Sequence, residues 1–434
     1  MRHGLERASS GRRRRLLLLL LLYATPVTAG PGAVDPVAPG SGDGAGGQVV
    51  KVAWSDLVHL VEAHPRLASG RSQVDAARRG VDVAGSVPNP SLEATVGRGV
   101  ARTGGASRIE WGVALTVPLG WIGQRSARVS GARSEVDAAV AETRLLRRDV
   151  LLQLQSLFWN LVFEQARVAT LEELQEHTRA LTATVRRRVE KGEARPIEGT
   201  RVEIELEKVE IELESARTSN GARQGELALW LGSPPGTSLV AVADLGLLPA
   251  PLDRETALAR VRATHPALAG AQARVQALEA EIQAERRGRL PSLAITGFAD
   301  DELDRRAYGV GLTVDVPLWN WNSGRIAQAE AQLAAGRYQS DAALRDVEAD
   351  VLQAQAACQG SVQVAARFKD NVVPRSETAA STIERTYQVG ETSLLELIDA
   401  RRTLLDARRM YLSALSQARI DCSRLDIIVG EEKP

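Results

Sequence analysis

Apolar and polar positions alternate along four short segments of the chain, which form two pairs. The first pair covers residues 91–97 and 110–118. The second pair lies about 200 positions later, where the alternation is cleanest from Tyr308 to Val316. A period of two residues predicts β-strands with one apolar face. Strands of about ten residues match the length of a tilted strand that crosses a membrane, although a strand half-buried on a soluble core gives the same pattern.

Helical patterns surround each strand pair. The stretches Gln124–Glu190 and Arg325–Val373 contain no proline, and apolar residues in the first recur every three, four or seven positions, as a helix–helix seam requires. Shorter helices are expected at about 55–86 and 253–288, before prolines that favour extended backbone. The segment Val202–Ser215 alternates like a strand but also repeats a heptad. Its Glu, Leu and Lys content favours a helix, with two apolar stripes.

The same series of motifs occurs twice along the chain. "EAHPRLASG" from Glu62 returns as "ATHPALAG" from Ala263, and a similar shift relates the strand pairs and the segments that follow them. A unit of about 200 residues is far longer than a solenoid repeat. We therefore predict an internal tandem duplication, with one copy at 49–245 and the other at 246–430.

The N-terminus has the features of a signal peptide, residues 1–29. A basic region at Arg12–Arg15 precedes seven leucines and the small-residue cleavage site Val27–Ala29. The apolar run is too short for a transmembrane helix, which needs about 20 residues. We therefore expect an exported chain, with a disordered Gly/Pro-rich leader at 30–48 and a short tail at 431–434.

The overall composition limits the classes of function. The chain has 54 basic and 54 acidic residues, which argues against a nucleic-acid partner. Aromatic residues make up only 4%, which suits long helices. No later segment has the length and apolarity of a membrane helix, so a membrane crossing requires strands. Four strands do not close a barrel, and copies of the chain must contribute the rest; three copies give twelve.

The most specific motif is "YQVGETSLLELIDARRTLLDA" from Tyr387, with a weaker counterpart, "VEKGEARPIEGTRVEIE", from Val189. With these motifs the chain resembles the TolC-like outer-membrane efflux proteins over about residues 50–430. The resemblance implies a mixed α and β membrane protein, a homotrimer. Its twelve-strand β-barrel, four strands per chain, lies in outer-membrane lipid and continues into a long α-helical tunnel across the periplasm. It also implies a periplasmic adaptor and an inner-membrane pump as partners, and a passive channel without cofactor or enzyme activity.

The resemblance also implies two kinds of site at the ends of the helices. Adaptor-contacting tips correspond to Gly192, Glu193, Gly390, Glu391 and Thr392. The acidic constriction of the family's periplasmic gate corresponds to Glu396 and Asp399. Three copies would give rings of carboxylates, which select cations. A solvated acidic helix face is the alternative. Arg201 occupies the position of Asp399 in the first half. We expect it to pair with a tip carboxylate when the gate is shut.

Aromatic residues lie near the ends of the strand pairs. An interfacial girdle of a membrane barrel explains this placement, and its candidates are Trp111, Trp121, Tyr308, Trp319 and Trp321. Gly192 and Gly390 have a different role, because each follows a long helix and precedes another. Glycine is the usual residue at such a stop, so we expect the chain to reverse there.

The two cysteines lie 32 residues on either side of Gly390. In an antiparallel hairpin that turns at this glycine, Cys358 and Cys422 reach the same height. Disulfides can persist in an exported protein, and we predict a bridge between the two cysteines. Two separate buried thiols are the alternative.

No other group of residues forms a recognisable chemical site. The five histidines lack metal-ligand spacing, and His64 and His265 each precede a proline, where a helix-start role is expected. We find no P-loop, nucleophile elbow or zinc-protease motif, so neither a metal nor catalysis is predicted. The alternative function is a periplasmic coiled-coil adaptor or scaffold without a barrel, against which the two strand pairs count. The sequence does not indicate the exported substrate.

Overall fold

The computed structural model describes all but the two ends and a few short internal segments. The described ranges are 49–100, 104–105, 107–120, 122–234, 236–246 and 249–430. They all belong to one compact unit. The predicted signal peptide (1–29), leader (30–48) and tail (431–434) lie outside the described residues.

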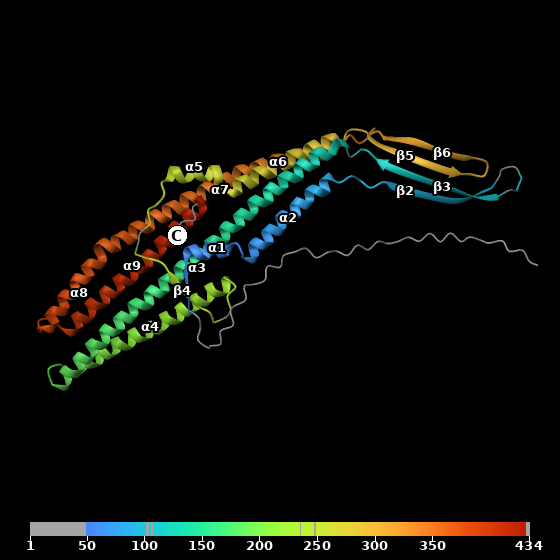
Figure 1. Cartoon of the computed structure of the whole chain (residues 1–434). Coiled ribbons are helices and arrows are strands. Elements are labelled where there is room, and N and C mark those ends of the chain that lie inside the picture. Colours follow the sequence, from blue (N-terminus) through green and yellow to red (C-terminus); the bar gives the residue numbers. More distant parts are fainter. Residues whose placement is uncertain are drawn as a thin grey trace, which may run out of the picture. The chain divides into compact units, whose positions relative to one another are not determined.

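Two similar series of elements make up this unit (Figure 1). The first series is α1 (Trp54–Val61), α2 (Pro65–Gly85), β2 (Ser91–Val100), β3 (Ser107–Pro118), α3 (Ile122–Glu190) and α4 (Pro196–Trp230). The second is α5 (Arg254–Thr264), α6 (Pro266–Arg287), β5 (Ser292–Asp301), β6 (Arg306–Asp315), α7 (Ser323–Arg367), the π-helical turn η1 (Phe368–Val372), α8 (Val373–Gln388) and α9 (Leu394–Val429). The order of elements therefore repeats as predicted. The long stretch that is one helix in the first half is divided by η1 in the second.

The strand pairs and the helix reversals lie at opposite ends of the long helices (Figure 1). At 1.5 Å per residue, the 69 residues of α3 alone extend about 100 Å. The segment predicted as a helix despite its strand-like alternation lies within α4, and that prediction is confirmed. Among the described residues, no helix combines the length and the apolarity needed to cross a membrane.

The short helices of each half are divided, which corrects the expectation of single helices at about 55–86 and 253–288. The division falls at a His-Pro pair, because proline disfavours helical backbone in the residue before it. The ring nitrogen Nδ1 of His64 accepts a hydrogen bond from the backbone N–H of Arg66 at 3.2 Å. His265 accepts one from Ala267 at the same distance. The helix-start role predicted for both histidines is confirmed.

The helix cap formed by His265 is expected to make the stability of the second half depend on pH. Burial, followed by the nearby charge of Arg148, lowers the pKa of His265 to about 4. Because the folded pKa is below the unfolded value near 6.5, the neutral ring stabilises the fold above pH 6.5. That contribution is lost as the pH falls toward 4. The full loss amounts to about 3 kcal/mol per chain.

We expect the free energy of unfolding in urea to fall by this amount between pH 6.5 and 4, beyond the fall in a His265→Asn variant. Asparagine caps a helix without titrating, so it is the matched control. The ring of His64 is less buried than that of His265 and packs against Trp230, with the ring centroids 4.6 Å apart. His64→Asn should therefore change the pH profile less than His265→Asn does. Equal profiles for wild type and His265→Asn would contradict the assignment.

Strands β2, β3, β5 and β6 form one antiparallel sheet in that order, which leaves β2 and β6 as unpaired edges. The register places the alternating apolar residues on one face, so the predicted alternation is confirmed. More than a third of the surface of these side chains is exposed: Leu92, Val96, Val113, Leu115, Leu293, Ile295, Tyr308, Val310 and Leu312. The strands also extend into the segments expected as loops.

A parallel strand pair that the sequence did not predict lies near the middle of the long helices (Figure 1). Strand β1 (Val49–Ala53) pairs with β4 (Ser238–Val242), and both are only five residues long. Beside them lies the largest cluster of buried side chains, which includes Trp54, Phe158 and Trp159 and draws residues from α1, α3, α4 and α9. This cluster holds the two halves together at mid-height.

Candidate functional site

The two helix reversals have the same backbone geometry. Gly192 and Gly390 adopt positive φ angles of 74° and 85°, a conformation that glycine tolerates best. At each reversal an N–H reaches back five residues, from Glu193 to the carbonyl of Arg188 at 2.8 Å and from Glu391 to that of Thr386 at 2.9 Å. This bond belongs to the Schellman motif that ends helices. The predicted reversals are confirmed.

The two tips differ in how the following helix begins. In the second tip, Ser393 accepts a hydrogen bond from the N–H of Glu396 at 3.3 Å, and the Glu396 carboxylate accepts one from the N–H of Ser393 at 3.1 Å. This reciprocal capping box fixes the first turn of α9. The hydroxyl of Thr392 lies 3.1 Å from that of Thr386. In the first tip, Pro196 begins α4 and no capping box forms.

The three residues predicted for a gate lie close to the tips and are exposed. Glu396 and Asp399 are three residues apart on α9 and so lie on one side of the helix. Arg201 lies near the start of α4. Within the described part of a single chain, no hydrogen bond or ion pair joins Arg201 to either carboxylate. The pairing predicted for Arg201 remains a prediction about the assembled channel.

Four arginines of α9 connect the two hairpins, α3–α4 and α8–α9, and none of them was predicted from the sequence. Arg402 holds both carboxylate oxygens of Glu205 on α4, with its Nε at 2.9 Å. One heptad further along, Arg409 lies 3.6 Å from Glu212, also on α4. The matching spacing of seven residues was visible in the sequence, but not which helix faces which.

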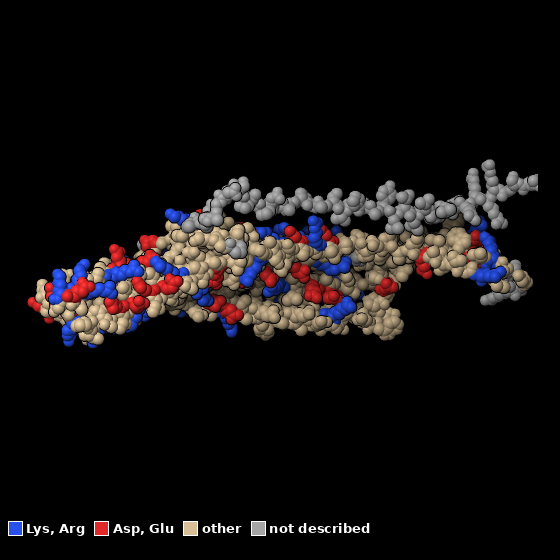
Figure 2. Space-filling view, turned by 90° about the horizontal axis from the view of Figure 1, so that it is seen from below, with Lys and Arg blue, Asp and Glu red and all other residues tan. Residues whose placement is uncertain are grey.

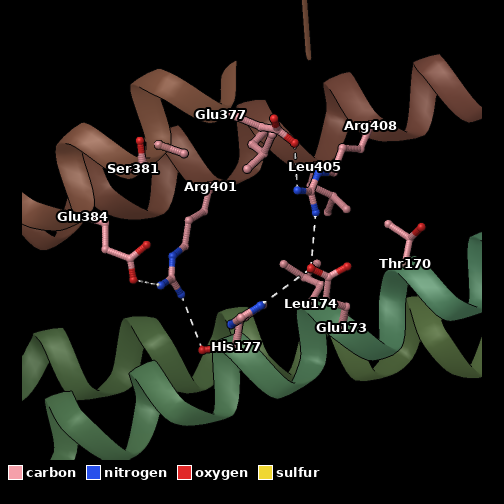
Figure 3. A pocket seen from close by; sticks show the side chains of 12 residues that line it. Thr170, Glu173, Leu174, His177, Glu377, Ser381, Glu384, Arg401, Leu405 and Arg408 are labelled. Atoms are coloured by element: carbon pink, nitrogen blue, oxygen red, sulfur yellow. Dashed lines mark hydrogen bonds and ion pairs between the residues drawn. The ribbon is translucent and has the colours of Figure 1, made fainter. Parts of the chain in front are cut away.

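The other two arginines line a cavity of about 430 Å³ between α3, α8 and α9. Figure 3 shows Arg401 and Arg408 extending from α9 into this space, toward α8 on one side and α3 on the other. Arg401 pairs with Glu384 at 2.7 Å, and Arg408 with Glu377 at 2.9 Å, both on α8. Arg408 also lies 3.6 Å from Glu173 on α3. Arg401 also donates to the backbone carbonyl of His177 on α3 at 3.5 Å, so each of these two arginines holds its own hairpin together and reaches the other one.

The contact between Arg402 and Glu205 keeps both groups charged. Hydrogen bonding from Arg402 holds the pKa of Glu205 below its usual value, although partial burial of the carboxylate opposes this effect. Hydrogen bonding to Glu205 in turn raises the pKa of Arg402, and the charge of Asp399 adds to it. Lys and Arg mix with Asp and Glu along the tip end of the helices, as Figure 2 shows. Asp399, predicted for the gate, therefore also contributes to the charge balance around Arg402.

The cysteines are joined by a disulfide between α7 and α9, with Cα atoms 4.6 Å apart. Cys358 and Cys422 are 0% and 3% exposed. They therefore lie at the same height on two antiparallel helices, as the spacing about Gly390 predicted. Neither sulfur faces solvent.

The aromatic residues lie at two levels of the strand sheet. Trp111 and Tyr308 are within a few residues of the ends of β3 and β6 that lead into the connecting loops. Trp319 and Trp321 lie at the opposite end, between β6 and α7, and Trp319 is 92% exposed. Trp121 lies outside the described residues. The described residues contain no group of three or more His, Cys, Asp or Glu placed to hold a metal ion.

The comparison with known proteins identifies the class of protein to which this fold belongs. Residues 57–233 and 257–431 each match the Outer membrane efflux protein family, and the chain belongs to that family. It is an outer-membrane efflux channel with a periplasmic helical tunnel, and a transport protein rather than an enzyme. The predicted mixed α and β fold in two repeats is confirmed, and the alternative of an adaptor is set aside.

Two relatives are each slightly more than a quarter identical to this chain over the aligned residues. The cobalt-zinc-cadmium resistance protein CzcC of Cupriavidus metallidurans is 27% identical over 369 residues, which cover 84% of this chain and 86% of the relative. The nickel-cobalt-cadmium resistance protein NccC of Alcaligenes xylosoxydans xylosoxydans is 26% identical over 342 residues, with coverage of 74% and 75%.

Solved structures match in fold. The open state of the MtrE outer membrane channel of Neisseria gonorrhoeae has a TM-score of 0.71 at 18% identity, and the match covers 87% of this chain and 89% of that one. A structure of CusC has a TM-score of 0.72, also at 18% identity, with coverage of 87% and 92%. The family implies a trimeric channel that works within a tripartite efflux system.

Proposed function

We propose that three copies of this chain form a passive duct that receives substrate from a periplasmic adaptor and an inner-membrane pump. The observation that carries this proposal is the pair of unpaired edge strands, β2 and β6, on a sheet with one exposed apolar face. Open edges are not viable in lipid, and joining them between copies gives a twelve-strand barrel. The exported chain loses residues 1–29, and the repeats 49–245 and 246–430 supply similar parts of the wall.

An exposed stripe on α4 supports close packing of neighbouring copies. Ile197, Ile204 and Ile211 follow one another at intervals of seven residues and are 52%, 49% and 68% exposed. The opposite stripe of the same helix, which includes Val202 and Leu213, is buried within the chain. Apolar residues at heptad spacing form the seams between packed helices. A neighbouring copy is the partner that covers this stripe.

Membrane fractionation with gel migration of unheated samples tests the duct. Each chain has a mass of 46.6 kDa before export. We expect an outer-membrane species near three chain masses that becomes a monomer on boiling. A double Ile204→Glu and Ile211→Glu variant should lower the yield of this species, whereas Leu229→Glu, at another exposed position of α4, should not. A soluble periplasmic monomer from the unaltered chain would refute the proposal.

The tips and the aromatic residues have assigned places in this duct. Adaptor contact falls on the reversals, whose residues are Gly192, Glu193, Gly390, Glu391 and Thr392. Their support is the matched backbone geometry of the two tips, which offers six similar ends in a trimer. The aromatic girdle falls on Trp111, Trp121, Tyr308, Trp319 and Trp321. Its support is the exposure of the described members at two levels of the sheet.

The gate is assigned to the start of α9 and the start of α4. Three copies of Glu396 and Asp399 give a ring of six carboxylates near the tips, with Arg201 of the first half as the counter-charge. Such rings favour cations over anions. The names of CzcC and NccC refer to resistance to cobalt, zinc, cadmium and nickel. We therefore assign divalent metal cations as the substrate class.

Neutralising the gate carboxylates should reduce the preference of the channel for cations. Glutamine at position 396 keeps the capping box of α9, so Glu396→Gln combined with Asp399→Asn leaves the helix start intact. In planar bilayers, the cation-to-anion permeability ratio should fall at least about threefold. Glu214→Gln is the control, because this exposed α4 carboxylate lies about 27 Å from the first residue of the helix. An unchanged ratio in the double variant would remove these residues from the gate.

A further inference from the structure

The buried clusters at equivalent places in the two halves differ in side-chain composition. Where α1 covers the first half, the buried cluster contains Trp54, Phe158 and Trp159, with ring centroids of the last two 5.2 Å apart. Where α5 covers the second half, the described residues of the buried cluster around the disulfide include no aromatic side chain. Besides the cysteines, it consists of Ala257, Val261, Val347, Val351, Ala354, Leu425, Ile428 and Val429. We call this set the bridge cluster.

Helix α5 closes the bridge cluster. Its Ala257 and Val261 are 0% and 1% exposed within the cluster. Asp253 caps the helix by accepting hydrogen bonds from the N–H groups of Glu255 and Thr256. The guanidinium of Arg262 on α5 donates to Glu348 on α7 at 2.7 Å. With α5 in this position the sulfurs are buried, so no protein-sized reactant reaches them.

We propose that the Cys358–Cys422 bridge forms before α5 docks, by thiol–disulfide exchange with a protein oxidant of the exported compartment, and that bridged chains are the ones that assemble. One cysteine thiolate attacks the reactive disulfide of the oxidant and forms a mixed disulfide, which releases the first oxidant thiol. The second cysteine then attacks the mixed disulfide and releases the other. The chain loses two protons and two electrons, and the oxidant takes them up and leaves as a dithiol.

The position of the bridge explains why assembly depends on it. The 63 residues between the cysteines include the end of α7, η1, α8, the second tip and most of α9. A bridge that closes such a loop restricts the unfolded chain and sets the register of α7 against α9. The aliphatic side chains of the bridge cluster bury less surface per residue than the aromatic side chains of the first half. The disulfide therefore fixes the position of the second tip along the tunnel wall.

A pulse-labelling experiment on the full-length exported chain tests the order of events. Free thiols are blocked with an alkylating reagent at successive times, and each sample is divided between a non-reducing gel and an unheated gel for the trimer. We expect the bridged form to appear before the trimer, and chains blocked early to be at least tenfold depleted from it. Trimers that contain unbridged chains in their full share would overturn the proposal.

Two variants separate oxidation from packing. Arg262→Ala weakens the docking of α5 and should leave the rate of bridge formation unchanged while it slows trimer formation. A bridge that forms only after trimer assembly in this variant would also overturn the proposal. Cys358→Ala with Cys422→Ala removes the oxidation step and leaves no thiol to block. Its trimer yield should fall and should no longer respond to removal of the oxidant, and a yield that still responds would refute the assigned cysteines.

Discussion

Replacing Arg402 with alanine is expected to raise the passive leak of ions through the trimer by up to about a hundredfold. Arg402 on α9 holds both carboxylate oxygens of Glu205 on α4, so the contact joins the two hairpins of one chain near the tips. A bidentate pair is stronger than a single-contact pair, but Arg402 is half exposed, which limits its contribution to about 1 kcal/mol. If the three chains open together, the closed state loses about 3 kcal/mol of stability. The population of the open state then rises roughly a hundredfold.

The prediction is specific to the connection between hairpins. Arg186 also forms a short contact, 2.6 Å from Glu203, but both residues belong to the hairpin α3–α4. Arg186→Ala should therefore leave the leak near that of the wild type. Conductance of purified trimers in planar bilayers measures both variants. Exchanging the charges, with Arg402→Glu and Glu205→Arg in one chain, should restore a low leak.

A leak that stays low in Arg402→Ala, or that rises equally in Arg186→Ala, would show that this contact does not hold the tunnel shut. Acid provides a second check. Because the pKa of Glu205 lies below its usual value, the pair stays charged through mildly acidic conditions and is lost only as the pH falls through that lowered pKa. The leak of the wild type should accordingly stay low at pH 5.

The features that the sequence predicted correctly depend on short-range rules. A glycine between two helical patterns requires a positive φ angle, and Gly192 and Gly390 have one. The strand alternation and the signature after Tyr387 are equally local. The height of Cys358 and Cys422 followed from Gly390 alone, because an antiparallel hairpin places residues equidistant from its turn at one level. These predictions needed no knowledge of the packing between distant segments.

The features that were missed depend on long-range packing. Strand β1 pairs with β4, 189 positions later for each pair in register, and neither five-residue segment has a distinctive pattern of its own. The arginine contacts of α9 required knowing that α4 lies on one side of it and α8 on the other. The single helices expected around His64 and His265 were wrong for a different reason. The local effect of the following proline was recognised at each histidine but was not applied to the helix boundary.

The second large effect is expected in the mid-height cluster, where Phe158→Ala should lower the free energy of unfolding by about 4 kcal/mol. Phe158 is fully buried, and its ring centroid lies 5.8 Å from that of Trp54 on α1. Alanine leaves a cavity at the point where α1 and the strand pair β1–β4 are held against α3. Urea unfolding of the detergent-solubilised protein measures the change, and Leu229→Ala, which removes a side chain that is 73% exposed, should stay within about 0.5 kcal/mol of wild type.

Phe158→Ala should loosen the first half of the chain and leave the second half folded. Because Phe158 holds α1 and not α5, limited proteolysis of Phe158→Ala should begin in the segment 49–63, while the bridge cluster of the second half stays protected. If a mild thiol reductant is present during proteolysis, Cys358 and Cys422 should therefore stay joined and unreactive to alkylation. Equal loss of protection in both halves would mean that the two clusters unfold as one cooperative unit. The division of the core into an aromatic half and a disulfide-linked half would then have no consequence for stability.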